Sequence, residues 1–350
     1  MKTIKTFFVI LLTAVAAACG GGGGGSGGGD SGGNSGGGSS GPIYTVSTLT
    51  LDQALSTPSG LTIDSNGNLY VADTSASLVK KIQNLSNSTV NVSAVLGGGL
   101  TDYNTCSGSR LSSPYGVAVD SAGILYVSEL SRVHIRYSNC VLDTSFQYGT
   151  ISLSSPGAIA LRDDNHLYVA DTGNHKIQLI TKTPPSSGTT TLLAGTSSGY
   201  VNGASNIAAF SSPTGIAVSS SGDVFVTDTN NCVVRKISVG QVSTLAGAGP
   251  TSCGSSDGTA TAAQFNRPTG IAVDASDNLY VADTVSNKIR RITPQGVVTT
   301  IAGSGASGST DGTGSGATFN TPTGIAVDTS GNVFVADYGS GKIRKITVRP

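Results

Sequence analysis

Carboxylates recur at one position along this 350-residue chain, and a ring of carboxylates can bind metal ions. Each of these residues ends a short apolar run of the type Leu-Tyr-Val-Ala: Asp73, Glu129, Asp171, Asp228, Asp283 and Asp337. A short acidic side chain that opens a turn rich in Thr and Asn accepts hydrogen bonds from the amides of its own loop. We therefore interpret these carboxylates as a structural device of the fold and predict no metal site.

Other catalytic patterns are weak in the sequence. The three histidines fall at different ends of predicted strands, His134 in the second repeat and His166 and His175 in the third, whereas a metal site needs ligands that converge. We find no Gly-x-Ser-x-Gly elbow with triad partners and no phosphate-binding loop before a helix. Asp257-Gly258 and Asp311-Gly312 are expected to be turns, and the basic residues of the third runs to be a solvated strand face. The sequence thus favours binding over catalysis and predicts no cofactor.

The first 41 residues do not belong to the fold. Lys2 and Lys5 precede an apolar stretch that is too short to span a bilayer comfortably, which is typical of a signal peptide over residues 1–18. The small residues before Cys19 resemble a bacterial lipobox, which implies lipidation of Cys19. Residues 19–41 are nearly all Gly and Ser, so they are predicted to be a flexible tether. We expect a lipid-anchored protein of the bacterial cell envelope; Gly20 after Cys19 favours the outer membrane, facing the periplasm or the surface.

A repeat governs residues 42–350, which are predicted to form one domain. Six copies resemble the segment PTGIAVDASDNLYVADTVSNKIRRI, and their first prolines are Pro58, Pro114, Pro156, Pro213, Pro268 and Pro322. Each copy contains three apolar runs separated by turn residues, and a fourth run such as Val298-Thr299-Thr300-Ile301 lies between copies. Four strands in each of six repeats predict an all-β fold, a six-bladed β-propeller.

The ends of the chain predict how the ring closes. The last copy stops after its third strand, at Pro350. Val46-Ser47-Thr48-Leu49, which precedes the first copy, is similar to Val242-Ser243-Thr244-Leu245, a fourth strand. We therefore expect the N-terminal strand to complete the last blade, which removes free sheet edges. An apolar residue three positions before each proline is expected to pack its loop onto the blades: Leu55, Leu111, Leu153, Phe210, Phe265 and Phe319.

The cysteines fit an oxidising compartment outside the cytoplasm. Cys232 lies in a turn between a second and a third strand, and Cys253 lies in the loop that follows the fourth strand of the same blade. Both connections open onto the same face of a four-stranded meander, so we predict a disulfide between them. Pairing of Cys106 with Cys140 stays open, because their connections point to opposite ends of the blade.

The repeated residues resemble the NHL-repeat family of propellers over about 300 residues. The resemblance rests on Pro-x-Gly-Ile-Ala-Val-Asp, Leu-Tyr-Val-Ala-Asp and Asn-x-Lys-Ile, and on the stretch Asp171-Thr172-Gly173-Asn174-His175-Lys176-Ile177. It implies a six-bladed ring but no single activity. We expect a non-enzymatic binding or scaffold domain. The alternative is a lyase or lactonase that acts at the mouth of the central channel; related metal-dependent lactonases would require Glu129 as a ligand.

The binding surface is expected on the face that carries the loops between fourth and first strands: residues 97–113, 195–212, 247–267 and 303–321. In five copies a residue stands between the first proline and a glycine, and it is expected near the channel mouth, as a ligand contact or merely as a cap of its strand: Ser59, Tyr115, Thr214, Thr269 and Thr323. The balanced charge, with 20 basic and 20 acidic residues, argues against nucleic acid. We expect the partner to be an envelope or extracellular protein or a glycan, and membrane contact to be through the lipid anchor only.

Overall fold

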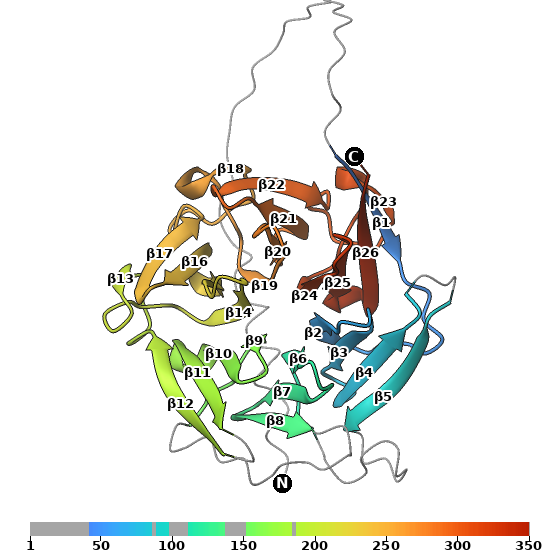
Figure 1. The fold of residues 1–350 in the computed structure, drawn as a ribbon. Coiled ribbons are helices and arrows are strands. Elements are labelled where there is room, and N and C mark those ends of the chain that lie inside the picture. Colours follow the sequence, from blue (N-terminus) through green and yellow to red (C-terminus); the bar gives the residue numbers. More distant parts are fainter. Residues whose placement is uncertain (1–41, 86–88, 98–110, 137–151, 184–186, 350) are drawn as a thin grey trace, which may run out of the picture. The chain divides into compact units, whose positions relative to one another are not determined.

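The computed structural model describes residues 42–85, 89–97, 111–136, 152–183 and 187–349. Its described strands form six sheets arranged around a central axis, which confirms the six-bladed β-propeller (Figure 1). The predicted signal peptide and tether, with Cys19, lie outside the described residues, as do Cys106 and Cys140. Among the described residues, no helix is long and apolar enough to cross a membrane.

Each blade is an antiparallel meander that runs outward from the axis. Blade 1 contains β2 (Pro58–Ile63), β3 (Leu69–Asp73), β4 (Leu78–Gln83) and β5 (Asn91–Gly97). Blade 2 contains β6 (Val117–Val119), β7 (Leu125–Glu129) and β8 (Arg132–Arg136). Blade 3 contains β9 (Ile159–Asp163), β10 (His166–Asp171), β11 (Lys176–Thr183) and β12 (Ser187–Ala194). Blade 2 is thus described with three strands, because its next residues lie outside the described part of the chain.

Blades 4 to 6 each carry a fifth, two-residue strand on their outer edge. Blade 4 contains β13 (Gly203–Ala204), β14 (Pro213–Val218), β15 (Val224–Asp228), β16 (Val233–Ser238) and β17 (Gln241–Ala246). Blade 5 contains β18 (Gly258–Thr259), β19 (Pro268–Val273), β20 (Leu279–Asp283), β21 (Lys288–Ile292) and β22 (Val297–Ala302). Blade 6 contains β23 (Gly312–Thr313), β24 (Pro322–Val327), β25 (Val333–Asp337), β26 (Lys342–Arg349) and β1 (Ile43–Thr48). Five single-turn 3₁₀ helices complete the described elements: η1 (Thr172–Asn174), η2 (Thr229–Asn231), η3 (Ala260–Ala262), η4 (Gly314–Gly316) and η5 (Tyr338–Ser340).

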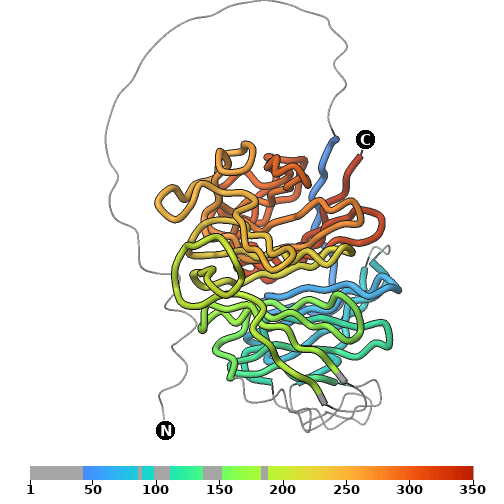
Figure 2. The backbone as a smooth tube through the Cα atoms, turned by 60° about the vertical axis from the view of Figure 1, so that its left-hand side comes forward, coloured from blue at the N-terminus to red at the C-terminus, as the bar shows by residue number. Residues whose placement is uncertain are grey.

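The N-terminal strand closes the ring, as the sequence predicted. β1 pairs antiparallel with β26 over six residue pairs, from Ile43 opposite Arg349 to Thr48 opposite Arg344. Figure 2 shows the blue start of the described chain running beside its red end. Val46 lies opposite Ile346 in this ladder, and both side chains are buried in the core that blade 6 shares with blade 5. The first and last strands therefore join one sheet.

The core consists of apolar layers between neighbouring blades. The layer between blades 4 and 5, for example, joins Phe225 and Val234 of one blade to Phe265 and Leu279 of the next. Second strands are buried on both faces, because each blade packs against a neighbour on either side. The predicted loop anchors are also buried in these layers: Leu55, Leu111, Leu153, Phe210, Phe265 and Phe319.

The innermost strands meet around the axis as a ring of six: β2, β6, β9, β14, β19 and β24. Backbone comes unusually close to backbone at the start of these strands. A Cβ atom on Gly270 would lie 2.0 Å from the carbonyl oxygen of Thr323, and one on Gly324 would lie 1.9 Å from that of Ser59. A side chain cannot fit at such distances, so glycine lets each first strand approach the next blade.

Candidate functional site: the channel mouth and its supports

The carboxylates at the ends of the second strands are structural, as predicted, but most of their backbone partners differ from the prediction. All six are buried, and each accepts an N–H from the residue 17 positions earlier, in the loop before the first strand of its blade; the Asn266 amide lies 2.7 Å from Asp283. Side chains of the carboxylate's own turn also donate in some blades, as Asn231 does to Asp228 at 2.8 Å. The long loop, rather than the short turn alone, is thus tied to the blade.

The interpretation of the third-strand basic residues as a solvated face was wrong for one residue in each of four blades. Arg235, Arg290 and Arg344 are fully buried and contact the carboxylate of the same blade at 2.8, 2.8 and 3.2 Å. Lys80 pairs with Asp73 at 3.0 Å. Successive strand residues point to opposite faces, so only the next residue of each pair is partly exposed: Lys81, Lys236, Arg291 and Lys345.

The buried arginines also hold the incoming loops in place. Arg290 donates to the backbone oxygens of Gln264 and Ser256 and to the Asp257 carboxylate, and its guanidinium lies 5.2 Å from the centre of the Phe265 ring. Asp257 in turn accepts two hydrogen bonds from Thr300 on β22. Arg344, Asp311 and Thr48 repeat this arrangement in blade 6. The glycines after these aspartates, expected in turns, instead begin β18 and β23.

Blades 2 and 3 use other partners for the buried carboxylate. In blade 2, His134 Nε2 contacts Glu129 Oε1 at 2.5 Å. Burial alone would raise the pKa of Glu129, but the hydrogen bonds from His134 and from the Ser112 amide hold it below its usual range. In blade 3, Gln178 takes the place of the cation and donates to Asp171. Glu129 therefore occupies the same structural position in blade 2 as the aspartates occupy in the other blades.

The described histidines are separate from one another, as expected. His134 contacts Glu129, His166 contacts Asp163 at 2.7 Å, and His175 Nδ1 accepts the Ser212 amide at 3.0 Å. Within the described residues, no group of three His, Cys, Asp or Glu side chains converges on a point where it could hold a metal ion.

The structure brings the five predicted ligand contacts together at one end of the channel. All of them line a small cavity of about 50 Å³ at the start of the first strands, which we call the channel mouth: Ser59, Tyr115, Thr214, Thr269 and Thr323. Four of the hydroxyls are already bonded within the fold. Thr269, for example, shares a 2.6 Å hydrogen bond with Thr284 and donates to the Thr323 carbonyl at 3.2 Å. The hydroxyls of Ser59, Thr269 and Thr323 also bond to backbone oxygens of the next blade, whereas that of Thr214 bonds within its own blade, so these contacts favour the structural alternative.

Tyr115 differs from the other four. Its phenol makes no hydrogen bond to any described residue, and its side chain is partly exposed in the channel mouth. Burial raises the pKa of Tyr115, and the nearby phenol of Tyr338 raises it further. The sequence analysis did not identify Tyr338 as a neighbour of Tyr115. The one signal was that Tyr338 follows its carboxylate where four other copies have Thr.

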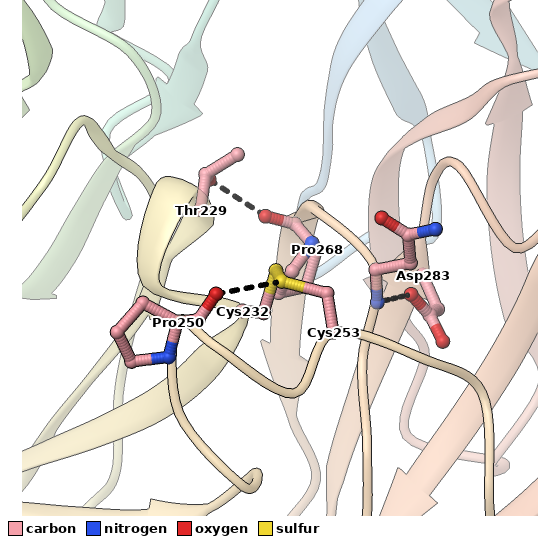
Figure 3. The surroundings of a disulfide bond; sticks show 7 residues. Thr229, Cys232, Pro250, Cys253, Pro268 and Asp283 are labelled. Carbon is pink, nitrogen blue, oxygen red and sulfur yellow. Dashed lines mark hydrogen bonds between the residues drawn. A yellow bond between two sulfur atoms is a disulfide. The ribbon is translucent and has the colours of Figure 1, made fainter. Parts of the chain in front are cut away.

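A disulfide joins Cys232 to Cys253, with their Cα atoms 5.5 Å apart (Figure 3). Cys232 directly follows η2 in the turn between β15 and β16, and Cys253 lies in the loop that leads to blade 5. Thr229, in the same turn, donates to the carbonyl of Pro268 at 2.7 Å. Both links fasten the turn of blade 4 to the chain that enters blade 5, on the face of the channel mouth.

Comparison with known proteins supports this architecture. The NHL repeat model matches residues 55–82, 153–178, 210–237 and 319–346, and the Teneurin NHL domain model matches residues 247–314. NHL repeat-containing protein 2 of Bos taurus is 28% identical over 324 residues, which cover 84% of this chain and 39% of that protein. The chain thus spans about two fifths of that relative's length.

Solved structures share the fold at low identity. An auxiliary nutrient binding protein from Bacteroides ovatus aligns with a TM-score of 0.65 at 18% identity, over 88% of this chain and 77% of that one. A streptogramin B lyase aligns with a TM-score of 0.55 at 16% identity, over 88% and 98% of the two chains. Four matched repeats and six blades of the same design lead to one conclusion: the chain belongs to the NHL-repeat family of six-bladed β-propellers.

Proposed function

We propose that this propeller is a non-enzymatic binding or scaffold domain whose binding surface is the face around the channel mouth. One observation carries the proposal: the carboxylates nearest this face are buried and bonded to groups of the fold, so they are not available to a ligand. Asp283, for example, is buried between the Asn266 amide and Arg290. The groups left at the mouth are hydroxyls and backbone oxygens, which can donate and accept hydrogen bonds but do not act as an acid or base near neutral pH.

The loops around the mouth suit recognition because they are held rigidly. Within residues 247–267, Arg290 binds Asp257 at the middle of the loop, and Phe265 near its end lies in the core. The Cys232–Cys253 disulfide fastens the first half of the same segment. A surface that is ordered before binding loses little conformational entropy when it captures a ligand. Such a platform fits an envelope or extracellular protein or a glycan.

The comparisons contain both classes of function on this fold. The Bacteroides ovatus protein is named for nutrient binding, and the streptogramin B lyase for catalysis. The engaged carboxylates support the first class for this chain. The second class would require a charged acid or base at the mouth, or a set of metal ligands, and the described side chains there supply neither.

An experiment that distinguishes binding of a ligand from its chemical conversion tests this proposal. Immobilised protein should retain a ligand from an envelope extract in stoichiometric amount, and mass spectrometry should recover that ligand chemically unchanged. Tyr115→Ala should reduce capture about tenfold or more, whereas Val239→Ala should not, because Val239 is 99% exposed in the turn between β16 and β17 at the opposite face. Multiple turnovers of a lactone or ester that depend on Tyr115 would overturn the proposal.

We also propose that lipidated Cys19 anchors the domain in the bacterial envelope, in the outer membrane. The apolar stretch before Cys19 and the Gly/Ser tract after it support this arrangement. Cys19→Ala should move the protein from the membrane fraction to the soluble fraction, because no lipid could be attached. Mass spectrometry of the native protein provides the independent check: a free thiol on Cys19 would contradict the proposal.

A further inference from the structure

The central channel has a second cavity, which opens at the face opposite the channel mouth. We call it the lower channel. It has a volume of about 280 Å³ and is lined by three successive residues of each of the six innermost strands, such as Leu61–Ile63 in blade 1 and Ile271–Val273 in blade 5. The first residue of each triplet also lines the channel mouth, so the two cavities meet along the axis of the propeller.

The channel is narrow at the mouth and wide at the opposite face. At the mouth, glycines such as Gly270 and Gly324 bring the backbones of neighbouring blades into contact, and the cavity there is only about 50 Å³. The innermost strands leave the larger space beyond this level. A small molecule would therefore enter the lower channel from the face opposite the mouth.

Backbone groups without a partner in their own sheet line the lower channel. Each innermost strand pairs on one side only, with the second strand of its blade. In an antiparallel pair, alternate residues direct both N–H and C=O toward the partner strand. In blade 1 the Asp64 amide bonds to the Asn68 carbonyl, which fixes this alternation. Thr62 therefore points its backbone groups at β3, whereas Leu61 and Ile63 point theirs toward the channel.

The same alternation recurs around the ring. The backbone bond that fixes it in blade 1 is repeated at the ends of the first strands of blades 2, 4, 5 and 6. Each of these strands thus directs the N–H and C=O groups of two residues toward the axis, as Ile271 and Val273 do in blade 5. The lower channel presents both donors and acceptors on most of its sides.

One side chain distinguishes blade 1 in this cavity. The middle residue of the triplet is Ala in five blades and Thr62 in blade 1, so Thr62 has the only polar side chain among the described residues that line the lower channel. Its side chain is partly exposed, and its hydroxyl makes no hydrogen bond to any described residue. By contrast, the Ser59 hydroxyl at the channel mouth bonds to the carbonyl of Ala72. The hydroxyl of Thr62 is therefore available to a ligand.

No charged side chain lines the lower channel among the described residues. The carboxylates that follow four of the innermost strands are bonded within their own turns; Asp274, for example, accepts two backbone amides and the hydroxyl of Tyr280. In blade 3 the corresponding residue is Arg162, which pairs with Asp163 at 2.9 Å. An ion would lose hydration in this cavity without gaining an opposite charge, which is costly. A hydroxyl both donates and accepts, so it can bond to either kind of backbone group.

We propose that the lower channel binds a small neutral polyol, no larger than one monosaccharide, with one of its hydroxyls bonded to Thr62. The cavity of about 280 Å³ lies close to the lower end of the size range of small-ligand sites, roughly 300–1,000 Å³. The other hydroxyls of the polyol bond to the free backbone groups of the innermost strands. This site is additional to the proposed function, which concerns the opposite face.

Isothermal titration calorimetry of the protein with neutral polyols tests this proposal. The series contains a cyclitol, an acyclic hexitol and a neutral monosaccharide, with a uronic acid and an amino sugar of the same ring as charged counterparts. We expect a neutral polyol to bind at one site per chain, and the charged counterparts to bind at least about tenfold more weakly. The proposal is wrong if no neutral polyol binds at millimolar concentration, or if a charged counterpart binds equally well.

Thr62→Ala tests where the polyol binds. The variant should fold, because it restores the residue that five other blades have at this position. It should weaken binding about two- to tenfold, as expected for the loss of one hydrogen bond. Thr62→Ser keeps the hydroxyl and should retain most of the affinity. Thr299→Ala is the matched control, because it makes the same change at an exposed position of β22, and it should leave binding unchanged.

Filling the cavity provides an independent test. Ala272→Leu places a larger side chain at the position in blade 5 that corresponds to Thr62, where Ala272 is partly exposed. Binding should fall at least about tenfold, while circular dichroism and Tm report whether the variant is folded; if it is not, Thr62→Ala decides the question. Unchanged affinity in Thr62→Ala, or in a folded Ala272→Leu variant, would place the polyol elsewhere and overturn the proposal. Capture of a ligand at the channel mouth is measured separately and does not depend on this result.

Discussion

Replacing Arg290 with Ala is expected to lower the free energy of unfolding by about 3–5 kcal/mol, because a buried charge loses its partner. Arg290 and Asp283 are both fully buried and lie 2.8 Å apart. The substitution would also leave the carbonyls of Gln264 and Ser256 without their donor. Urea unfolding followed by circular dichroism measures the loss. The neighbouring Arg291→Ala is the matched control and should cost under about 1 kcal/mol, since Arg291 is partly exposed on the other face.

The cost of this substitution should depend on pH. Burial raises the pKa of Asp283 to about 6, although the Asn266 amide and Arg290 act to lower it. A carboxyl whose pKa is raised by folding keeps its proton in the folded state where the unfolded chain has lost it, so its contribution to stability falls as pH rises. Without Arg290 the pKa of Asp283 rises further. The loss should therefore be largest above about pH 6 and smaller at pH 5.

Two outcomes would contradict this account of the buried pair. One is an equal loss of stability in Arg290→Ala and Arg291→Ala, which would mean that burial of the guanidinium does not decide its contribution. The other is a loss in Arg290→Ala that is unchanged between pH 5 and pH 7.5. As a further check, Arg290→Ala combined with Asp283→Ala should recover part of the loss, because the unpaired carboxylate is then absent.

The fold could be predicted from the sequence because several independent features of the repeat agree. Strand runs, turn residues and the missing fourth strand of the last copy all pointed to the same closed ring. The apolar residues before each proline, such as Phe265, could be assigned to the core because an apolar residue recurred in otherwise polar loops. These features depend on local pattern, which a single sequence displays directly.

The partners of charged residues could not be predicted in the same way. Arg290 and Arg291 are adjacent and alike in type, yet one is buried and the other is partly exposed. The difference arises from the loop that returns over the blade to bring Asp257 and Phe265 against one face of β21. Such a contact joins residues about 30 positions apart, through a loop without regular pattern. The alternation of strand faces does predict that only one residue of each adjacent basic pair is buried, but it does not tell which one.

The meeting of the five predicted contacts at one cavity could be derived from the sequence, whereas their hydrogen bonds could not. The five residues after the first prolines do meet at one cavity, as their shared place in the repeat required. That shared place, however, is a reason to regard most of them as structural, because a position that repeats six times serves what the six blades have in common. Tyr115 is the exception, because it is a Tyr where four other blades have Ser or Thr, and its hydroxyl makes no hydrogen bond to a described residue.

Deleting residues 1–51 is expected to abolish cooperative unfolding of the propeller and to promote aggregation. The deletion removes β1, which pairs with β26 over six residue pairs and contributes Val46 to the core of blade 6. It also removes Thr48, the partner of Asp311 in the loop that Arg344 holds. The exposed edge of β26 would then present unpaired backbone groups along Lys342–Arg349, and such an edge is a template for intermolecular pairing.

The matched control is a chain that begins at residue 42, which lacks the same signal peptide and tether but keeps β1. It should unfold in a single transition and remain monomeric by size-exclusion chromatography. A point variant separates loss of the core contact from loss of the strand: Val46→Asp retains the chain but places a charge at a position that is 2% exposed. It should destabilise the domain by several kcal/mol, about the cost of burying an unpaired charge. If the chain that begins at residue 52 melts like the control, closure of the ring through β1 does not hold the propeller together.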